Sequence, residues 1–209
     1  MVSPMSDEAQ RGQQSVLDDR PAGESGRARA SRWARSKRRL SSADLRAVHF
    51  FSRAGRWRLG RASAVLISRL GNGWIYPILA LMLVAHFGAK APRVILAAGI
   101  NAGLLHCLYP VLKRLIARPR PFRIDARVAS LSGVLDEHSF PSGHAMTLTG
   151  VLVPIVMAWP DCLSAAVALL FMMGWARMAS GHHYPSDVCA GAGIGFVISY
   201  PISVWALGV

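Results

Sequence analysis

Residues 94–112 read VILAAGINAGLLHCLYPVL, an apolar run that only Asn101 and His106 interrupt. A helix needs about 20 predominantly apolar residues to cross the core of a bilayer. The run ends at Lys113 and Arg114, and cationic side chains of this kind commonly mark the end of a span. We therefore expect a membrane-spanning helix here.

Four further apolar stretches surround this run, at residues 74–88, 144–159, 163–178 and 188–209. The first of them is short for a span and can gain length from residues 64–70. Only helices and closed barrels satisfy every backbone polar group in lipid. The sequence therefore predicts an all-α, polytopic membrane helix bundle of about five to six spanning helices.

The positive charge is concentrated in the first third of the chain. The 209 residues carry a net charge of +13 and are 52% hydrophobic. Most of the charge lies between Arg27 and Arg69, whereas the residues after Gly143 carry almost none. This polarity is typical of a membrane protein, so we expect no nucleic-acid partner. Residues 1–42 show no apolar periodicity, which predicts a disordered basic tail.

Residues 43–70 predict an amphipathic helix that lies at the membrane surface. Apolar side chains alternate there with arginines: Leu45, Val48, Phe51 and Trp57 stand among Arg46, Arg53, Arg56 and Arg58. Such a helix binds the interface and attracts anionic lipids. The alternatives are a helix packed only on its own protein and a sixth crossing. Residues 71–209 then form the membrane domain.

Three polar clusters lie at the ends of the predicted spans. They are Lys113 with Arg120, the stretch PSGH from Pro141 to His144, and Arg177 with His183 and Asp187. Counting the crossings places all three clusters on one side of the membrane, which predicts a single site. The loop 113–142 is also longer than a usual helix connection, and such loops often carry function.

The residue types of this site suit a phosphate group. Guanidinium and ammonium groups donate charge-assisted hydrogen bonds to several anionic oxygens. Ser142 and Gly143 open a helix, where free N–H groups and the helix dipole also favour an anion. One imidazole can attack phosphorus while another protonates the leaving oxygen, and the carboxylate of Asp187 can orient His183. Neither a metal nor a cofactor is required for this scheme.

The three clusters resemble the motifs of the type 2 phosphatidic acid phosphatase (PAP2) superfamily, K-x6-RP, PSGH and SR-x5-H-x3-D. Here they read KRLIARPRP from Lys113, PSGH from Pro141 and ARMASGHHYPSD from Ala176. The resemblance covers residues 74–209 and implies a metal-independent membrane lipid phosphatase that forms a phosphohistidine. Ala176 replaces the serine of the family pattern, and we expect this change to reduce the affinity for phosphate.

The resemblance also implies a role for each motif residue. His183 is the nucleophile, Asp187 orients it, and His144 protonates the leaving group. The phosphate is bound by Lys113, Arg120, Ser142, Gly143 and Arg177. The substrate is a lipid phosphate or diphosphate, such as a polyprenyl diphosphate, phosphatidic acid, phosphatidylglycerol phosphate or a phosphorylated lipid A.

Other interpretations stay open from the sequence alone. In a non-enzymatic lipid carrier or scaffold the motif histidines would be dispensable, and a vanadate-dependent haloperoxidase of the same superfamily would need vanadate. His182 rivals His183, although the motif spacing selects His183. We expect interfacial anchors at Arg114, Arg118, Arg123 and Arg127, and plain loop residues, not a metal site, at Asp136, Glu137 and His138.

The expected location is a bacterial inner membrane. Five crossings place the amino terminus on the same side as the site, and the basic tail favours the cytoplasm under the positive-inside rule. Many membrane members of the superfamily instead face away from the cytoplasm. The side therefore stays open, with a preference for the extracytoplasmic face, and the sequence does not predict the oligomeric state.

Overall fold

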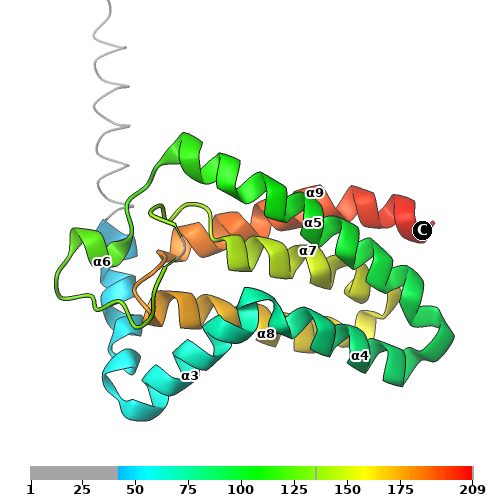
Figure 1. Ribbon diagram of the computed structural model, residues 1–209, viewed down its shortest axis with the longest axis horizontal. Coiled ribbons are helices and arrows are strands. Elements are labelled where there is room, and N and C mark those ends of the chain that lie inside the picture. Colours follow the sequence, from blue (N-terminus) through cyan, green and yellow to red (C-terminus); the bar gives the residue numbers. More distant parts are fainter. Residues whose placement is uncertain (1–41, 135, 209) are drawn as a thin grey trace, which may run out of the picture. The chain divides into compact units, whose positions relative to one another are not determined.

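The computed structural model describes residues 42–134 and 136–208, so the predicted tail of residues 1–42 lies, apart from Ser42, outside the described residues. Residues 42–52 are helical. They are followed by α3 (Arg58–Arg69), α4 (Ile75–Phe87), α5 (Ala91–Ile116), α6 (Pro121–Ile124), α7 (Gly143–Ala158), α8 (Leu163–Ala179) and α9 (Pro185–Leu207), shown in Figure 1. The short turns are η1 (Ala54–Arg56), η2 (Leu70–Trp74), η3 (Gly88–Lys90) and η4 (Pro160–Cys162). The predicted all-α fold is confirmed.

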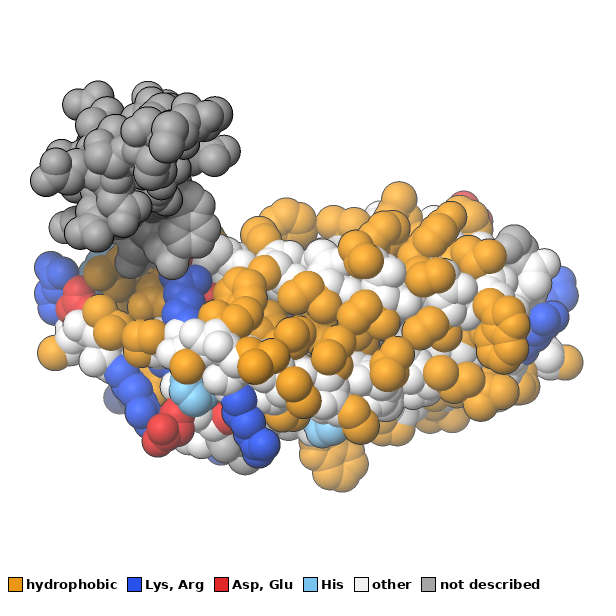
Figure 2. Space-filling model, turned by 90° about the horizontal axis from the view of Figure 1, so that it is seen from above, with side chains coloured by type: hydrophobic (Ala, Val, Ile, Leu, Met, Phe, Trp, Pro, Cys, Tyr) orange, Lys and Arg blue, Asp and Glu red, His pale blue; other side chains and the backbone are white. Residues whose placement is uncertain are grey.

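The helices α4, α5, α7, α8 and α9 fall on the five predicted apolar runs. By length and composition, three helical stretches of the described chain could cross a membrane: Arg58–Ile116, Pro160–Ala179 and Pro185–Leu207. The first stretch contains α3, α4 and α5, because the chain turns back at Gly88, whose φ of 56° suits glycine. α7 is a shorter apolar helix. Figure 2 shows hydrophobic side chains along the helices and Lys and Arg gathered toward the ends, the distribution of an integral membrane protein.

α7 is the central helix of the bundle. Its residues 145–155 are all buried, and it packs against α5, α8 and α9 (Figure 1). A Cβ at Gly195 of α9 would lie 2.4 Å from the carbonyl oxygen of Met146, so only glycine permits this approach. Small residues of this kind let membrane helices pack closely. The beginning of α7 is therefore fixed against the middle of α9.

Asn101 joins three helices inside the bundle. Its Nδ2 donates hydrogen bonds to the carbonyl oxygen of Gly150 in α7 at 3.1 Å and to Oγ of Ser203 in α9 at 3.0 Å. A polar side chain in a membrane helix is costly unless a neighbouring helix satisfies it. Asn101 therefore has a structural role in the packing of α5.

The region 43–70 contains helix 42–52, η1 and α3. α3 packs on α8, where Ala64 clusters with Ala176 and Ala179, and it continues through η2 into α4 with a bend at Gly73 (Figure 1). On the outside, Trp57 is 76% exposed. One face of this region therefore packs on the protein and the other is free, while its position at a membrane interface stays a prediction.

One end of the bundle carries all three motif clusters. α5 ends there, α7 begins, α8 ends and α9 begins, beside α6 and the loop 117–142 (Figure 1). The alternation of helix directions therefore brings segments that are distant in the sequence to the same end, as the crossing count predicted.

Candidate active site

A cavity of about 730 Å³ opens at this end of the bundle. Six of the eight predicted site residues line it: Lys113, Arg120, Gly143, His144, Arg177 and His183. Ser142 and Asp187 do not line it, and both are fully buried. The structure thus brings the three motif clusters into one cavity, with two motif residues in its supporting layer.

Ser142 acts as the N-cap of α7. Its Oγ accepts a hydrogen bond from the N–H of Ala145 at 3.5 Å, and its own N–H donates to the carbonyl oxygen of Asp187 at 3.0 Å. The first turns of α7 and α9 are therefore joined directly. A contact between Ser142 and phosphate stays a prediction.

His183 lies in the turn between α8 and α9 and is 1% exposed. Its Nδ1 is 2.6 Å from the carbonyl oxygen of Ser139, and because a carbonyl can only accept, Nδ1 carries the proton. Nε2 is then the nitrogen with the free lone pair. Burial, followed by the positive charges of Arg177 and Arg120, holds the pKa of His183 well below its usual value. The imidazole is therefore neutral, which is the nucleophilic form.

Arg177 is a buried cation with an unused donor. The residue is 6% exposed, and its Nε has no hydrogen-bond partner among the described residues. A buried guanidinium N–H without a partner is costly. Because Arg177 lines the cavity, an anion bound there would satisfy this donor.

Asp136 lies between two of the predicted phosphate ligands. Its Oδ2 is 2.7 Å from Nζ of Lys113, and its Oδ1 is 2.7 Å from Nη2 of Arg120. Burial alone would raise the pKa of Asp136, but the hydrogen bond and charge of Lys113, with Arg120, hold it below its usual value. Asp136 is therefore an anion, and it forms ion pairs with two cations that were predicted from the sequence to bind phosphate.

His144 begins α7 and faces η2. Its Nε2 lies 2.8 Å from Oδ1 of Asn72, and an amide oxygen accepts, so Nε2 carries the proton. Asn72 also lines the cavity. The Nε2–H of His144 and the amide oxygen of Asn72 therefore form a hydrogen bond at the wall of the cavity beside η2.

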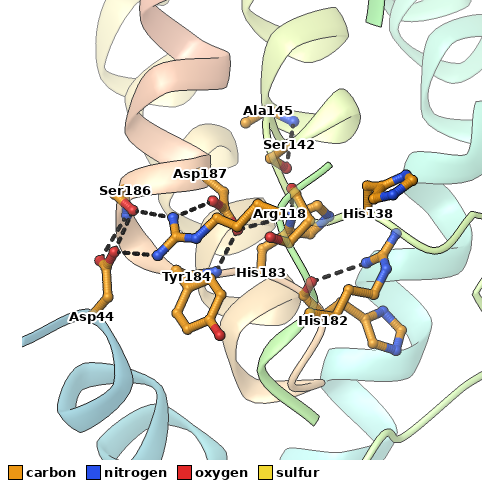
Figure 3. Close-up of polar contacts among 12 residues, drawn as sticks. Asp44, Arg118, His138, Ser142, Ala145, His182, His183, Tyr184, Ser186 and Asp187 are labelled. Carbon is orange, nitrogen blue, oxygen red and sulfur yellow. Dashed lines mark hydrogen bonds and ion pairs between the residues drawn. The ribbon is translucent and has the colours of Figure 1, made fainter. Parts of the chain in front are cut away.

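Arg118 approaches the site from the loop after α5. Its Nη1 donates to Oδ1 of Asp187 at 2.7 Å, and its guanidinium lies 3.9 Å from the centre of the Tyr184 ring. Figure 3 shows Arg118 among Asp187, Ser186 and Asp44. Burial would lower the pKa of Arg118, but the carboxylates of Asp187 and Asp44 more than offset it and raise the pKa. Arg118 is therefore part of the layer behind His183, where the sequence analysis expected an interfacial anchor.

His182 does not line the cavity. Its Nε2 lies 3.0 Å from Oγ of Ser130 and 3.2 Å from the carbonyl oxygen of Ser132, so it ties down the loop. Burial and the charge of Arg177 lower its pKa to about 3. Of the two adjacent histidines, only His183 lines the cavity.

Among the described residues, no cluster of His, Cys, Asp and Glu could hold a metal ion.

Residues 93–208 match the PAP2 superfamily. The chain belongs to this superfamily. The first motif, PSGH and the third motif all lie within the matched residues, so the family predicted from their spacing is confirmed. Helix 42–52, α3 and α4 lie outside the matched part of the chain.

Several relatives of this PAP2 chain are named phosphatases. Decaprenylphosphoryl-5-phosphoribose phosphatase of Mycobacterium tuberculosis is 31% identical over 137 residues, which cover 66% of this chain and 75% of that protein. Lipid A 1-phosphatase of Rhizobium johnstonii is 32% identical over 118 residues, which cover 54% of this chain and 46% of that protein. Undecaprenyl-diphosphatase of Sulfolobus acidocaldarius is 25% identical, covering 65% of this chain and 66% of that protein.

Two solved structures share the fold. The transmembrane PAP2-type phosphatidylglycerolphosphate phosphatase of Bacillus subtilis has a TM-score of 0.63 and 24% identity, covering 81% of this chain and 87% of that chain. LpxE of Aquifex aeolicus has a TM-score of 0.57 and 24% identity, covering 79% of this chain and 94% of that chain. At this level of identity the likeness shows the PAP2 membrane fold.

The PAP2 motif does not include Asn72, Arg118 or Asp136, and none of them was predicted from the sequence to belong to the site. Arg118 lies within the x6 spacer of the first motif, and Asp136 lies in the long loop already expected to carry function. The position of Arg118 in the motif spacer and that of Asp136 in the long loop were the signals in the sequence that could have indicated a role in the site. Asn72 lies between Gly71 and Gly73, a composition typical of a break between helices, and nothing in its surroundings pointed to His144.

Ala176, which stands where the family motif has serine, does not line the cavity. It is fully buried in the contact of α8 with α3, beside Ala64. The expected loss of phosphate affinity from the missing serine hydroxyl stays a prediction.

Proposed function

We propose that this chain is a membrane phosphatase that hydrolyses the phosphomonoester or diphosphate of a lipid through a phosphohistidine at His183. The observation that carries the proposal is the neutral His183, with Nδ1–H bound to Ser139, in one cavity with Lys113, Arg120 and Arg177. Membership of the PAP2 superfamily and the phosphatase names of its relatives support the same activity.

In the first step, Nε2 of His183 attacks phosphorus and the bond from phosphorus to the leaving oxygen breaks. His144 gives its Nε2 proton to that oxygen, so the lipid leaves as an alcohol or as a lipid phosphate. Lys113, Arg120 and Arg177 donate to the phosphoryl oxygens as charge develops on them. No protein atom other than Nε2 forms a bond to phosphorus in this step.

In the second step, His144 takes a proton from a water molecule, and the oxygen of that water attacks the phosphohistidine. Inorganic phosphate leaves, His183 regains its lone pair, and His144 regains its proton. The amide oxygen of Asn72 accepts the Nε2 proton and so keeps His144 in the Nε2–H tautomer. The leaving oxygen takes the place of Asn72 as the acceptor of this proton in the first step.

The substrate is a lipid because the cavity continues between the helices. A second, apolar cavity of about 280 Å³ is lined by residues of α4, α5 and α7 and shares Tyr76 and Ala102 with the first. Gly99 and Gly103 of α5 contribute no side chain to these walls, and a Cβ on either would meet no atom within 4 Å. A prenyl or acyl chain fits this crevice, with its phosphate at Arg177.

The candidate substrates are a polyprenyl phosphate or diphosphate, phosphatidylglycerol phosphate, phosphatidic acid and a lipid A phosphate. The relatives act, by their names, on a decaprenyl-linked phosphate, on lipid A and on undecaprenyl diphosphate. A polyprenyl-linked phosphate is the first to test, because the relative with 75% of its length covered carries that name.

The proposed location is the bacterial inner membrane, with the site on the extracytoplasmic face. The arginines of residues 43–70 then bind anionic lipids beside the exposed Phe50, Trp57 and Leu59. Labelling of a single engineered cysteine near Glu137 by an impermeant maleimide in intact cells, on a background without the native cysteines, tests the side.

The decisive experiment measures phosphate release from a panel of lipid phosphates by detergent-purified protein in EDTA. His183→Ala should abolish release, whereas the control His86→Ala, in α4 and outside the cavity, should match the wild type. Orthovanadate, which resembles a phosphoryl group in transfer, should inhibit the reaction. Equal activity of the His183→Ala variant and the wild type, or no release from any lipid, would favour a carrier or scaffold.

A further inference from the structure

Asp187 has no exposure to solvent, so a charge on its carboxyl group requires partners inside the protein. Burial raises the pKa of Asp187, and the charge of Arg118 opposes this rise. Its Oδ2 accepts from the N–H of Tyr184 at 2.9 Å. Its Oδ1 lies 2.7 Å from Nη1 of Arg118, which is the cation paired with it among the described residues. The same Nη1 also donates to Oγ of Ser186 at 2.7 Å.

Arg118 is in turn held by helix 42–52. Its Nη2 lies 2.8 Å from Oδ2 of Asp44, a residue that is only 8% exposed. The Asp44 carboxylate also accepts from the N–H of Ser186 at 3.2 Å and from its hydroxyl at 2.5 Å, at the first turn of α9. Figure 3 shows the guanidinium of Arg118 between the two carboxylates and beside Tyr184. A planar guanidinium fixed on both edges has little freedom to rotate.

We propose that Arg118 is a positioning residue of this active site, which holds Asp187 beside His183 and is itself held by Asp44. The inference rests on the proposed phosphatase function. It adds to the motif a residue of the x6 spacer and a residue of helix 42–52, which lies outside the matched residues 93–208.

The geometry gives Arg118 a defined task. Oδ2 of Asp187 lies 3.6 Å from Nδ1 of His183, which is too long for a hydrogen bond. Phosphorylation of Nε2 makes the ring more cationic, and a small turn of the carboxylate about Oδ1 then brings Oδ2 within bonding distance of Nδ1–H. Arg118 holds Oδ1 and the N–H of Tyr184 holds Oδ2, so the two contacts together set the orientation of the carboxylate. Without Arg118, Oδ1 loses its cation and the carboxylate is free to rotate about the contact of Oδ2 with the N–H of Tyr184.

The test compares Arg118→Gln, Arg118→Lys and Asp44→Asn with the wild type, as full-length protein in detergent. The substrate is the lipid phosphate that the wild type hydrolyses best. For Arg118→Gln we expect kcat to fall about 100-fold, the loss that a misplacement of about 1 Å can cause. KM and inhibition by vanadate should stay within about twofold, because Lys113, Arg120 and Arg177 are unchanged. Arg118→Lys should recover part of kcat.

Asp44→Asn leaves Arg118 paired with Asp187 and should lower kcat less, by roughly three- to tenfold. In the Arg118→Gln background it should lower kcat no further, because Asp44 acts through Arg118. The matched control is Arg127→Gln, whose side chain is 75% exposed and pairs with Asp125. This variant should behave as the wild type.

An unchanged kcat in Arg118→Gln, or a rise in KM equal to the loss of kcat/KM, would overturn the inference. If Arg118→Gln does not yield folded protein, the decision passes to Arg118→Lys and Asp44→Asn, and wild-type kcat in both would overturn it. A wild type that releases phosphate from no lipid would instead refute the proposed function itself, so the two failures are distinguishable.

Discussion

The Asp136 carboxylate lies 2.7 Å from Nζ of Lys113, and its second oxygen is equally close to Arg120. A bound phosphate that uses these two cations must replace the carboxylate or share them with it. Asp136 therefore competes with the substrate for the same donors. The competition also favours release of inorganic phosphate after the reaction.

The first prediction is that Asp136→Asn tightens anion binding. Loss of the carboxylate frees Lys113 and Arg120, so the inhibition constant of vanadate should fall roughly tenfold, which corresponds to about 1.4 kcal/mol. KM should fall with it. The control is Glu137→Gln, because the side chain of the adjacent Glu137 is 73% exposed and, among the described residues, pairs with the exposed Arg123. Weaker vanadate inhibition in Asp136→Asn would mean that Asp136 orders the cations and does not compete.

The second prediction concerns the 2.8 Å contact between Asn72 and His144. If Asn72 orients His144 as a proton donor, Asn72→Ala should lower kcat for a lipid alkyl phosphate by about 10- to 100-fold, within the usual range for general acid catalysis. A substrate with a good leaving group, such as p-nitrophenyl phosphate, needs little protonation and should be affected much less. Equal losses on both substrates would assign Asn72 to folding or to phosphate binding.

The third prediction is the pH dependence that follows from His183. Burial and the neighbouring cations keep its pKa well below 6.5, and protonation would remove the lone pair of Nε2. As pH falls, His183 therefore stays unprotonated through pH 6.5, and the acid limb that it causes in kcat/KM lies well below this value. Ionisation of the substrate, measured separately by ³¹P NMR, must be subtracted from the profile. An enzymatic limb at or above pH 6.5 would show that His183 is not the titrating nucleophile in this environment.

The sequence was sufficient for the features that depend on local pattern. Apolar run length located α4, α5, α7, α8 and α9, and the motif spacing selected His183 over His182. These features follow from helix periodicity and from the direction of successive crossings, which place Lys113 and His144 at one end of the bundle.

The features that the sequence did not predict depend on side chains from segments that are distant in the chain. Asp136 meets Lys113 only because the long loop folds back over the end of α5, and Arg118 meets Asp44 across 74 positions of the chain. From the sequence, Arg118 was expected to be an interfacial anchor and Asp136 a plain loop residue. Burial of Asp187 is what requires a cation there, and burial in a loop region has no periodic signature.

The last prediction tests the crevice between α4 and α5. Gly103 lines the active-site cavity, and a Cβ there would meet no atom within 4 Å, so Gly103→Leu should fold and fill the space. We expect kcat/KM for a long-chain prenyl or acyl phosphate to fall at least tenfold, mainly through KM, because the chain loses its apolar contacts. A soluble short-chain phosphate should be hydrolysed at a nearly unchanged rate.

Gly193→Leu in α9 is the matched control, since a Cβ at Gly193 would also meet no atom within 4 Å and Gly193 lies outside both cavities. If both leucine variants retain full activity on the long-chain substrate, the lipid chain lies elsewhere than between these helices.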